Sequence, residues 1–162
     1  MCGKICSGKS THAQALKKAH NAVILSVDEI TLALFGQDAG DKMDDYVART
    51  EEYLYRKSLE ILEAGVDVIL DWGFWTRKER DYAGQFYGSR GVPYELHYIE
   101  IGDAEWHRRL QKRNRDVLEH RSDAYFVDDG LAAKFQSVFE KPDPAEISLK
   151  VGQDGCPLPD TN

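Results

Sequence analysis

The chain lacks any apolar run of the length that a membrane span needs. A transmembrane helix requires about 20 consecutive, predominantly apolar residues, and charged residues interrupt every such stretch of this sequence. The first residues also lack the apolar stretch of a secretory signal. We therefore expect a soluble, cytoplasmic protein without a membrane partner.

The chain has few cysteines, and its basic residues are fewer than its acidic ones. The three cysteines of the 162 residues form neither a C-x-x-C pair nor a Cys/His zinc spacing, so the sequence predicts no disulfide framework and no zinc site. Lys and Arg number 21 against 28 Asp and Glu, which gives a formal net charge of -7. Because nonspecific nucleic-acid binding depends on neutralising phosphates with basic side chains, the charge argues against a nucleic-acid partner.

A phosphate-binding pattern is present at the start of the chain, where residues 3–10 read G-K-I-C-S-G-K-S. In such a loop the glycines let the backbone wrap closely, so that its N–H groups and the following helix point at phosphate oxygens. Lys9 would reach the β- and γ-phosphates, and Ser10 would supply a hydroxyl to Mg2+. An ordinary Gly/Ser turn before a helix is the alternative. We predict ATP and Mg2+ as cofactors, with a nucleotide site made of Gly3, Lys4, Ile5, Cys6, Ser7, Gly8, Lys9, Ser10 and Thr11.

Short apolar runs alternate with longer helical stretches along the chain. This alternation predicts an α/β fold of three layers, the P-loop NTPase architecture, with a parallel sheet between helices. We expect one domain over residues 1–152 and a C-terminal tail at 153–162. Strands are predicted at 21–27, 66–72, 94–101 and 147–151, and helices at 11–20, 44–64, 77–89, 103–114 and 130–139.

Only Met1 and Cys2 precede the loop, although the loop of this architecture follows a central strand. A central strand normally has about five or six residues. We therefore expect that the first strand is truncated and that Met1 is an internal methionine. The alternative is that a short chain forms the fold without that strand.

Acidic residues follow two of the predicted strands. Asp28 comes directly after the run 21–27, at the sheet edge where open α/β folds bind ligands. Its carboxylate could accept the proton of an attacking hydroxyl, and capping of the next helix is the alternative. Asp71 ends an apolar run in the manner of the acidic residue that helps to hold Mg2+. The aromatic residues that follow are expected in the core or in an acceptor pocket: Trp72, Phe74 and Trp75.

Basic residues gather near the end of the fourth predicted helix. Arg113 and Arg115 are predicted in a mobile lid, residues 113–130, whose closure could place an arginine against the transferring phosphoryl group. Arg109 is a candidate for binding the adenine or the phosphates. A solvated charged face is the alternative for this run. Arg77 and Arg80 are expected to pair with carboxylates, and binding of an anionic acceptor is the alternative.

Several stretches together resemble the small P-loop kinases grouped as AAA-type ATP-binding proteins, which are similar to polynucleotide 5'-kinase, chloramphenicol phosphotransferase and the zeta toxins. The stretches are GKICSGKST, LSVDEITLALFG, VILDWGFWTRKERD and RLQKRN, followed by FEKP near the end of the chain. The resemblance implies a five-stranded parallel sheet and a lid with arginines. It also implies an aspartate after the second strand that acts as base toward the acceptor hydroxyl, and this aspartate corresponds to Asp28.

One departure bears on the acceptor. Polynucleotide kinases carry an arginine three residues after that aspartate, and this chain has Thr31. Together with the acidic net charge, the threonine favours a small hydroxylated acceptor over a nucleic acid. We predict an ATP-dependent kinase with Lys9, Asp28, Arg113 and Arg115 as catalytic residues. The alternatives are a nucleotide-binding switch or partner-binding module without acceptor chemistry, or a polynucleotide 5'-kinase.

Overall fold

The structure, a computed structural model, describes residues 1–38 and 40–159. The last three residues of the predicted tail lie outside the described residues. The chain forms two compact units. The first contains residues 1–9, residues 73–111 and the chain from Val127 onward, and the second contains residues 10–72 and 112–126.

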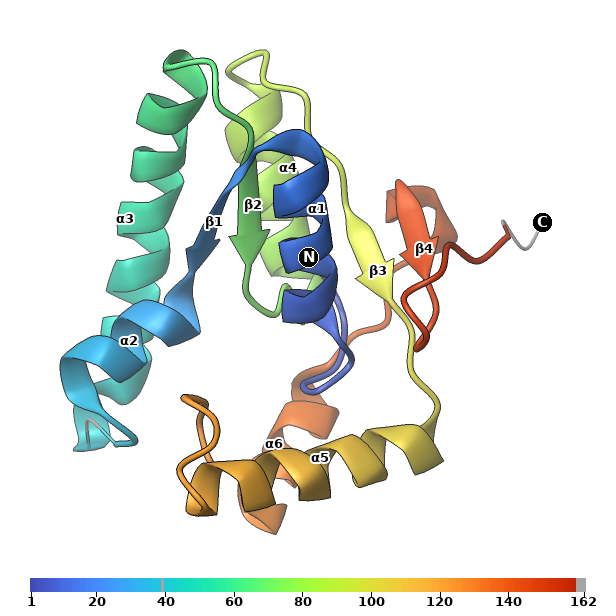
Figure 1. The fold of residues 1–162 in the computed structure, drawn as a ribbon. Helices are drawn as coiled ribbons and strands as arrows, with labels where there is room; N and C mark the ends of the chain where they lie inside the picture. Colours follow the sequence, from blue (N-terminus) through green and yellow to red (C-terminus); the bar gives the residue numbers. More distant parts are fainter. Residues whose placement is uncertain (39, 160–162) are drawn as a thin grey trace. The chain divides into compact units, whose positions relative to one another are not determined.

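The second unit is built on two parallel strands, β1 (Val23–Ser26) and β2 (Val68–Asp71), which lie side by side in Figure 1. The register pairs the first residue of β1 with the first of β2 and Ser26 with Asp71. Helix α3 (Met43–Glu63) packs against both strands and against α2 (Val27–Phe35). This unit also holds most of α1 (Lys9–His20) and the short helix η1 (Gly40–Lys42).

Helix α2 begins directly where β1 ends, and the sequence prediction lacks this helix. Its N-cap is Ser26, whose Oγ accepts a hydrogen bond from the backbone N–H of Glu29. The alternative that Asp28 caps the helix is therefore wrong, because Asp28 lies within the first turn. Val27 is apolar like the residues of β1, so the apolar pattern does not show where the strand ends and the helix begins. The spacing S-x-x-E at 26–29 is a capping-box signature that would have placed it.

The first unit contains a second parallel pair, β3 (His97–Ile99) and β4 (Leu149–Val151). Cys2 adds a parallel bridge to Tyr98: its N–H donates to His97 O at 2.8 Å, and its carbonyl accepts from Ile99 N at 2.9 Å. The residue directly before the phosphate loop is thus fixed to β3. Cys2 is fully buried, and burial raises the pKa of its thiol.

Three α-helices and a short 3-10 helix complete this unit: α4 (Arg77–Gly88), α5 (Asp103–Leu118), α6 (Asp129–Val138) and η2 (Pro144–Glu146). Helix α5 runs four residues further than predicted, and its last turns belong to the second unit. Arg113 and Arg115 therefore lie on a helix, and the irregular segment begins only after Leu118. An ion pair of Lys112 with Asp116, one helical turn apart, supports the extra turn.

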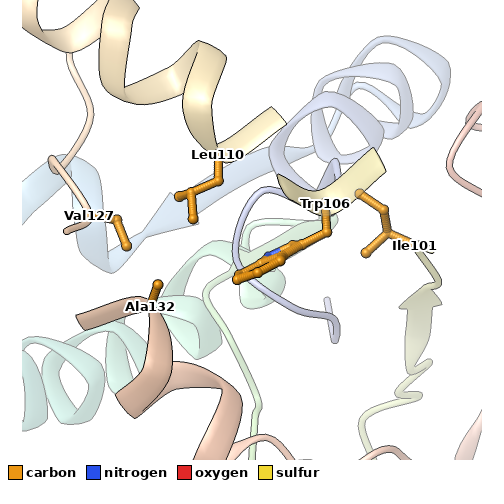
Figure 2. Close-up of a cluster of buried hydrophobic side chains, with 5 residues drawn as sticks. All are labelled: Ile101, Trp106, Leu110, Val127 and Ala132. Carbon is orange, nitrogen blue, oxygen red and sulfur yellow. The ribbon is translucent and has the colours of Figure 1, made fainter. Parts of the chain in front are cut away.

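A cluster of buried apolar side chains in the first unit packs against the phosphate loop. Figure 2 shows its five members, which come from the chain just after β3, from α5 and α6, and from the chain just before α6: Ile101, Trp106, Leu110, Val127 and Ala132. Ile5 and Cys6 of the phosphate loop pack against this cluster. Trp106 Nε1 also donates to the carbonyl of Ile5 at 2.9 Å. The cluster thus fixes the position of the loop by apolar packing and by one hydrogen bond.

Arg80 joins three segments of the first unit. Its side chain is 3% exposed, and its Nε donates to Glu146 Oε2 at 2.6 Å. Its Nη1 donates to the carbonyls of Phe74, Trp75 and Glu140. Burial is the largest single influence and lowers the pKa of Arg80, but the hydrogen bond to Glu146 and the nearby charges together outweigh it, so this pKa lies above its ordinary value. The predicted pairing with a carboxylate is present.

The architecture confirms the α/β class, since both strand pairs are parallel and helices alternate with them along the chain. Within the described ranges, none of the helices combines the length and the apolar character needed to cross a membrane.

Candidate functional site

The loop at residues 3–8 has a backbone that only glycine suits at two places. Gly3 has φ +152°, and a Cβ there would lie 2.7 Å from Ile99 O and 2.8 Å from Ser7 Oγ. Gly8 has φ +111°, and a Cβ there would lie 3.2 Å from a guanidinium nitrogen of Arg109. Both glycines therefore permit a tight wrap that any side chain would disrupt.

Lys9 opens helix α1 and turns back over the loop. Its Nζ donates to Gly3 O and to Lys4 O, each at 2.9 Å. The ammonium is thus held on the loop itself, where the pattern G-x-x-x-x-G-K-S places the phosphate-binding lysine. Lys4 has another partner, because its Nζ pairs with Asp103 at 2.9 Å.

The hydroxyl of Ser7 is buried in the loop without a hydrogen-bond partner. Among the described residues, the buried side-chain polar atoms in this condition are Ser7 Oγ, Trp75 Nε1 and Tyr94 Oη. Leaving such a group unsatisfied costs about 1–3 kcal/mol. A donor without a partner, next to the N-terminus of α1, suits an anionic group. The residues of the loop therefore fit a phosphate.

Arg109, on α5, braces the loop from the side. Its Nη1 donates to Ser7 O at 2.9 Å, its Nε donates to Glu105 at 2.6 Å, and its Nη2 donates to Gln153 O. Hydrogen bonds from Arg108 and Arg109 lower the pKa of Glu105 to about 2, which keeps this carboxylate charged. The predicted contact of Arg109 with adenine or phosphate stays a prediction. The sequence could not indicate that Arg109 binds the loop carbonyl of Ser7, because the two residues are 102 positions apart.

Replacing Arg109 with Met is expected to weaken ATP binding about tenfold, because one charge-assisted hydrogen bond to the loop is worth about 1.5 kcal/mol. Titration calorimetry with a non-hydrolysable ATP analogue measures the affinity. Arg108→Met is the matched control, since Arg108 pairs with the same Glu105 but its side chain is 67% exposed. Equal affinities of the two variants would show that the brace is dispensable.

In the second unit, acidic residues gather at the carboxyl end of the strand pair. The register places Asp71 opposite Ser26, at the last position of both strands. Asp28 lies two residues after Ser26, on the first turn of α2. The side chains of Asp28 and its neighbour Glu29 are both exposed. Ser10 lies in this same unit on α1. In the described ranges no three His, Cys, Asp or Glu residues group as metal ligands.

Residues 124–126, which follow α5 in the second unit, are hydrogen-bonded to Gln37 and to Arg113. Gln37, just beyond α2, donates from Nε2 to Ala124 O and accepts at Oε1 from Phe126 N, both at 2.9 Å. Arg113 donates from Nε to Tyr125 O at 3.1 Å. Sequence reasoning missed Gln37 and Tyr125, because no local pattern links residues almost 90 positions apart.

The aromatic residues after β2 divide between core and pocket. Phe74 is 2% exposed, and Trp72 packs edge-on against Tyr55 with ring centroids 5.5 Å apart. Trp75 instead lines a small pocket of the first unit, and its ring packs against Phe135. The other pocket residues come from the loop and from helices α5 and α6 or the residues next to them: Lys4, Ile5, Trp106, Gln136 and Phe139.

A family model described as an AAA domain matches residues 1–142. The structure is similar to an unliganded sugar kinase from Janibacter sp. HTCC2649, with a TM-score of 0.65 and 16% identity over 94% of this chain and 83% of that chain. It is similar to Kti12 from Chaetomium thermophilum in complex with ADP-AlF3, with a TM-score of 0.67 and 18% identity over 93% and 85%.

A third similar structure is a chain of the Pnkp1/Rnl/Hen1 RNA repair complex, with a TM-score of 0.68 and 19% identity over 99% of this chain and 47% of that chain. A comparison with curated protein sequences gives no match. At these identities the structural likenesses establish the fold. They agree with the family match and with the resemblance to AAA-type P-loop proteins.

Proposed function

Because the chain belongs to the AAA_33 family of AAA domains, whose model matches residues 1–142, we propose that it is an ATP-dependent kinase. It transfers the γ-phosphoryl group of ATP to a hydroxyl of a small molecule. The observation that carries the proposal is the loop: Lys9 lies over two of its carbonyls, and the buried hydroxyl of Ser7 has no partner. Both groups are donors of the kind that bind phosphate oxygens.

The loop residues bind and orient the nucleotide. Backbone N–H groups between Gly3 and Gly8 and the N-terminus of α1 take the phosphates, and Lys9 exchanges a loop carbonyl for a phosphate oxygen. Mg2+, when bound with ATP, neutralises charge on the β- and γ-phosphates, and Ser10 and Asp71 are the residues that would hold it.

Asp28 is the proposed general base. Its exposed carboxylate takes the proton of the acceptor hydroxyl while the hydroxyl oxygen forms a bond to the γ-phosphorus. The bond from that phosphorus to the β,γ-bridging oxygen breaks, and ADP leaves with the electron pair. Arg113 and Arg115 are the proposed partners of the charge that develops on the phosphoryl group. Arg113 is half-buried and held by Tyr125, whereas Arg115 is exposed.

The net charge of -7 supports a small acceptor over a polynucleotide, since it opposes approach of a polyanion. The similarity to a sugar kinase structure also supports a hydroxylated acceptor. We propose the cytoplasm as the place of action.

The test is ADP formation by the purified protein, with and without a panel of polyols, sugars, aminoglycoside antibiotics, nucleosides and a 5'-hydroxyl oligonucleotide. At least one small acceptor is expected to accelerate ADP formation and to carry the labelled γ-phosphate. Binding of ATP without transfer to any of them would favour a nucleotide switch. Transfer to the oligonucleotide alone would favour a polynucleotide kinase.

A further inference from the structure

The hydroxyl of Tyr125 begins a short chain of hydrogen bonds that ends at the first turn of α2. Tyr125 Oη donates to Thr31 Oγ1 at 2.9 Å, and Thr31 Oγ1 donates to Val27 O at 2.9 Å. Thr31 Oγ1 also lies 3.4 Å from the carbonyl oxygen of Asp28. The phenol is therefore anchored at the turn that presents the proposed base.

The direction of these bonds is fixed, because each hydroxyl has one proton. Thr31 is fully buried and gives its proton to the helix backbone, so the proton between the two hydroxyls comes from Tyr125. Tyr125 is half-buried, and its oxygen has only lone pairs left to offer a ligand. Burial raises the pKa of Tyr125; the bond to Thr31 opposes this rise, and the charge of Asp28 adds to it.

The acidic groups at this edge accept hydrogen bonds, as the phenol oxygen of Tyr125 does. The carboxylates of Asp28 and Glu29 lie on the first turn of α2, and Asp71 ends the neighbouring strand. An ionised carboxylate accepts hydrogen bonds and cannot donate them. A ligand hydroxyl or amine can donate to these oxygens, whereas a ligand phosphate or carboxylate meets like charge.

The backbone around Tyr125 is fixed before any ligand binds. The amide of Gln37 spans the residue by bonding the backbone on both sides of it, and Arg113 binds the carbonyl of Tyr125 itself. Because these three bonds and the bond to Thr31 act together, the phenol oxygen is held in one place. Such preorganisation is what turns a polar contact into selectivity.

Resting on the proposed function, we propose that Tyr125 is a specificity-determining residue for the acceptor. Its oxygen selects acceptors that present a hydrogen-bond donor, a hydroxyl or an amine, beside the reacting hydroxyl. Acceptors with a phosphate or a carboxylate at that place are rejected. The acceptor class is thus neutral or amino-bearing polyhydroxylated compounds.

Binding of matched acceptor pairs tests the selection without any need for turnover. The pairs are D-glucose with D-glucuronate, xylitol with D-xylonate, and adenosine with adenosine 3'-phosphate, each titrated in the presence of a non-hydrolysable ATP analogue. The neutral members are expected to bind at least about tenfold more tightly, the equivalent of one charge-assisted contact. Equal binding, preference for the anionic members, or no binding of any pair would overturn the inference.

Two variants separate the polarity of the phenol from its bulk. Thr31→Val removes the proton acceptor of Tyr125 at nearly constant volume, so the phenol can donate. The preference for neutral acceptors is then expected to fall about five- to tenfold. Tyr125→Phe is expected to weaken neutral acceptors by a similar factor without any gain for anionic ones. An unchanged preference in both variants would show that Tyr125 does not select.

A kinetic split distinguishes this role from a structural one. Tyr125→Phe is expected to raise KM for the acceptor while KM for ATP stays unchanged, and Tyr53→Phe, at a 51% exposed position on α3, is the matched control. A parallel rise of both KM values would overturn the inference. Labelled-phosphate transfer is scored separately: no transfer to any acceptor contradicts the proposed function, whereas transfer without the neutral preference contradicts only the selection by Tyr125.

Discussion

Acceptor phosphorylation is expected to fall by about 10²- to 10⁴-fold when Asp28 is replaced with Asn, the range typical of losing a general base. The amide keeps the size of the side chain but cannot take the proton. Asp28 is exposed on the first turn of α2, so the fold should tolerate the change. ATP affinity is expected to change little, since the phosphate loop belongs to other residues. The measurements are kcat for transfer and the Kd of an ATP analogue.

Glu29→Gln is the matched control for this variant, because Glu29 is the next residue, exposed on the same turn. It removes one negative charge from the helix start without removing the proposed base. If Asp28→Asn lowers ATP affinity and turnover in parallel, Asp28 acts as a metal or structural group. If both variants retain full transfer, the kinase mechanism has lost its base.

Replacing Lys9 with Ala is expected to lower productive ATP use by about 10²- to 10³-fold, as removal of one preorganised charge from a reaction centre does. The lysine is partly buried by its own loop, and its ammonium also holds the carbonyls of Gly3 and Lys4. The variant should therefore bind ATP more weakly as well as turn it over more slowly. Steady-state ADP formation and calorimetric affinity measure the two effects.

The control for the loop lysine is Lys18→Ala, an exposed lysine near the end of the same helix. Both variants should unfold at temperatures close to that of the parent chain, because neither removes a core side chain. If Lys9→Ala turns over ATP as fast as Lys18→Ala, the phosphate loop does not bind phosphate in the proposed way.

The residues that depend on local sequence were predictable. The phosphate loop is contiguous, and its glycines, its lysine and the start of α1 follow from one short pattern. Strands β1 and β2 follow from runs of β-branched residues, and their carboxyl ends place Asp28 and Asp71 at one edge. The end of α5 was predicted too early, since the ion pair of Lys112 with Asp116 carries the helix beyond Asn114.

The sequence by itself determined the α/β class and the loop, because both rest on residues close together in the chain. Tertiary structure alone decided the partners of the site. Arg109 reaches Ser7 across 102 positions, and Tyr125 reaches Thr31 across 94. Pairings at such separations leave no periodicity or motif, since they depend on which elements the folded chain brings together. The physical reason is that a hydrogen bond requires two groups within about 3 Å, and sequence distance does not set that separation.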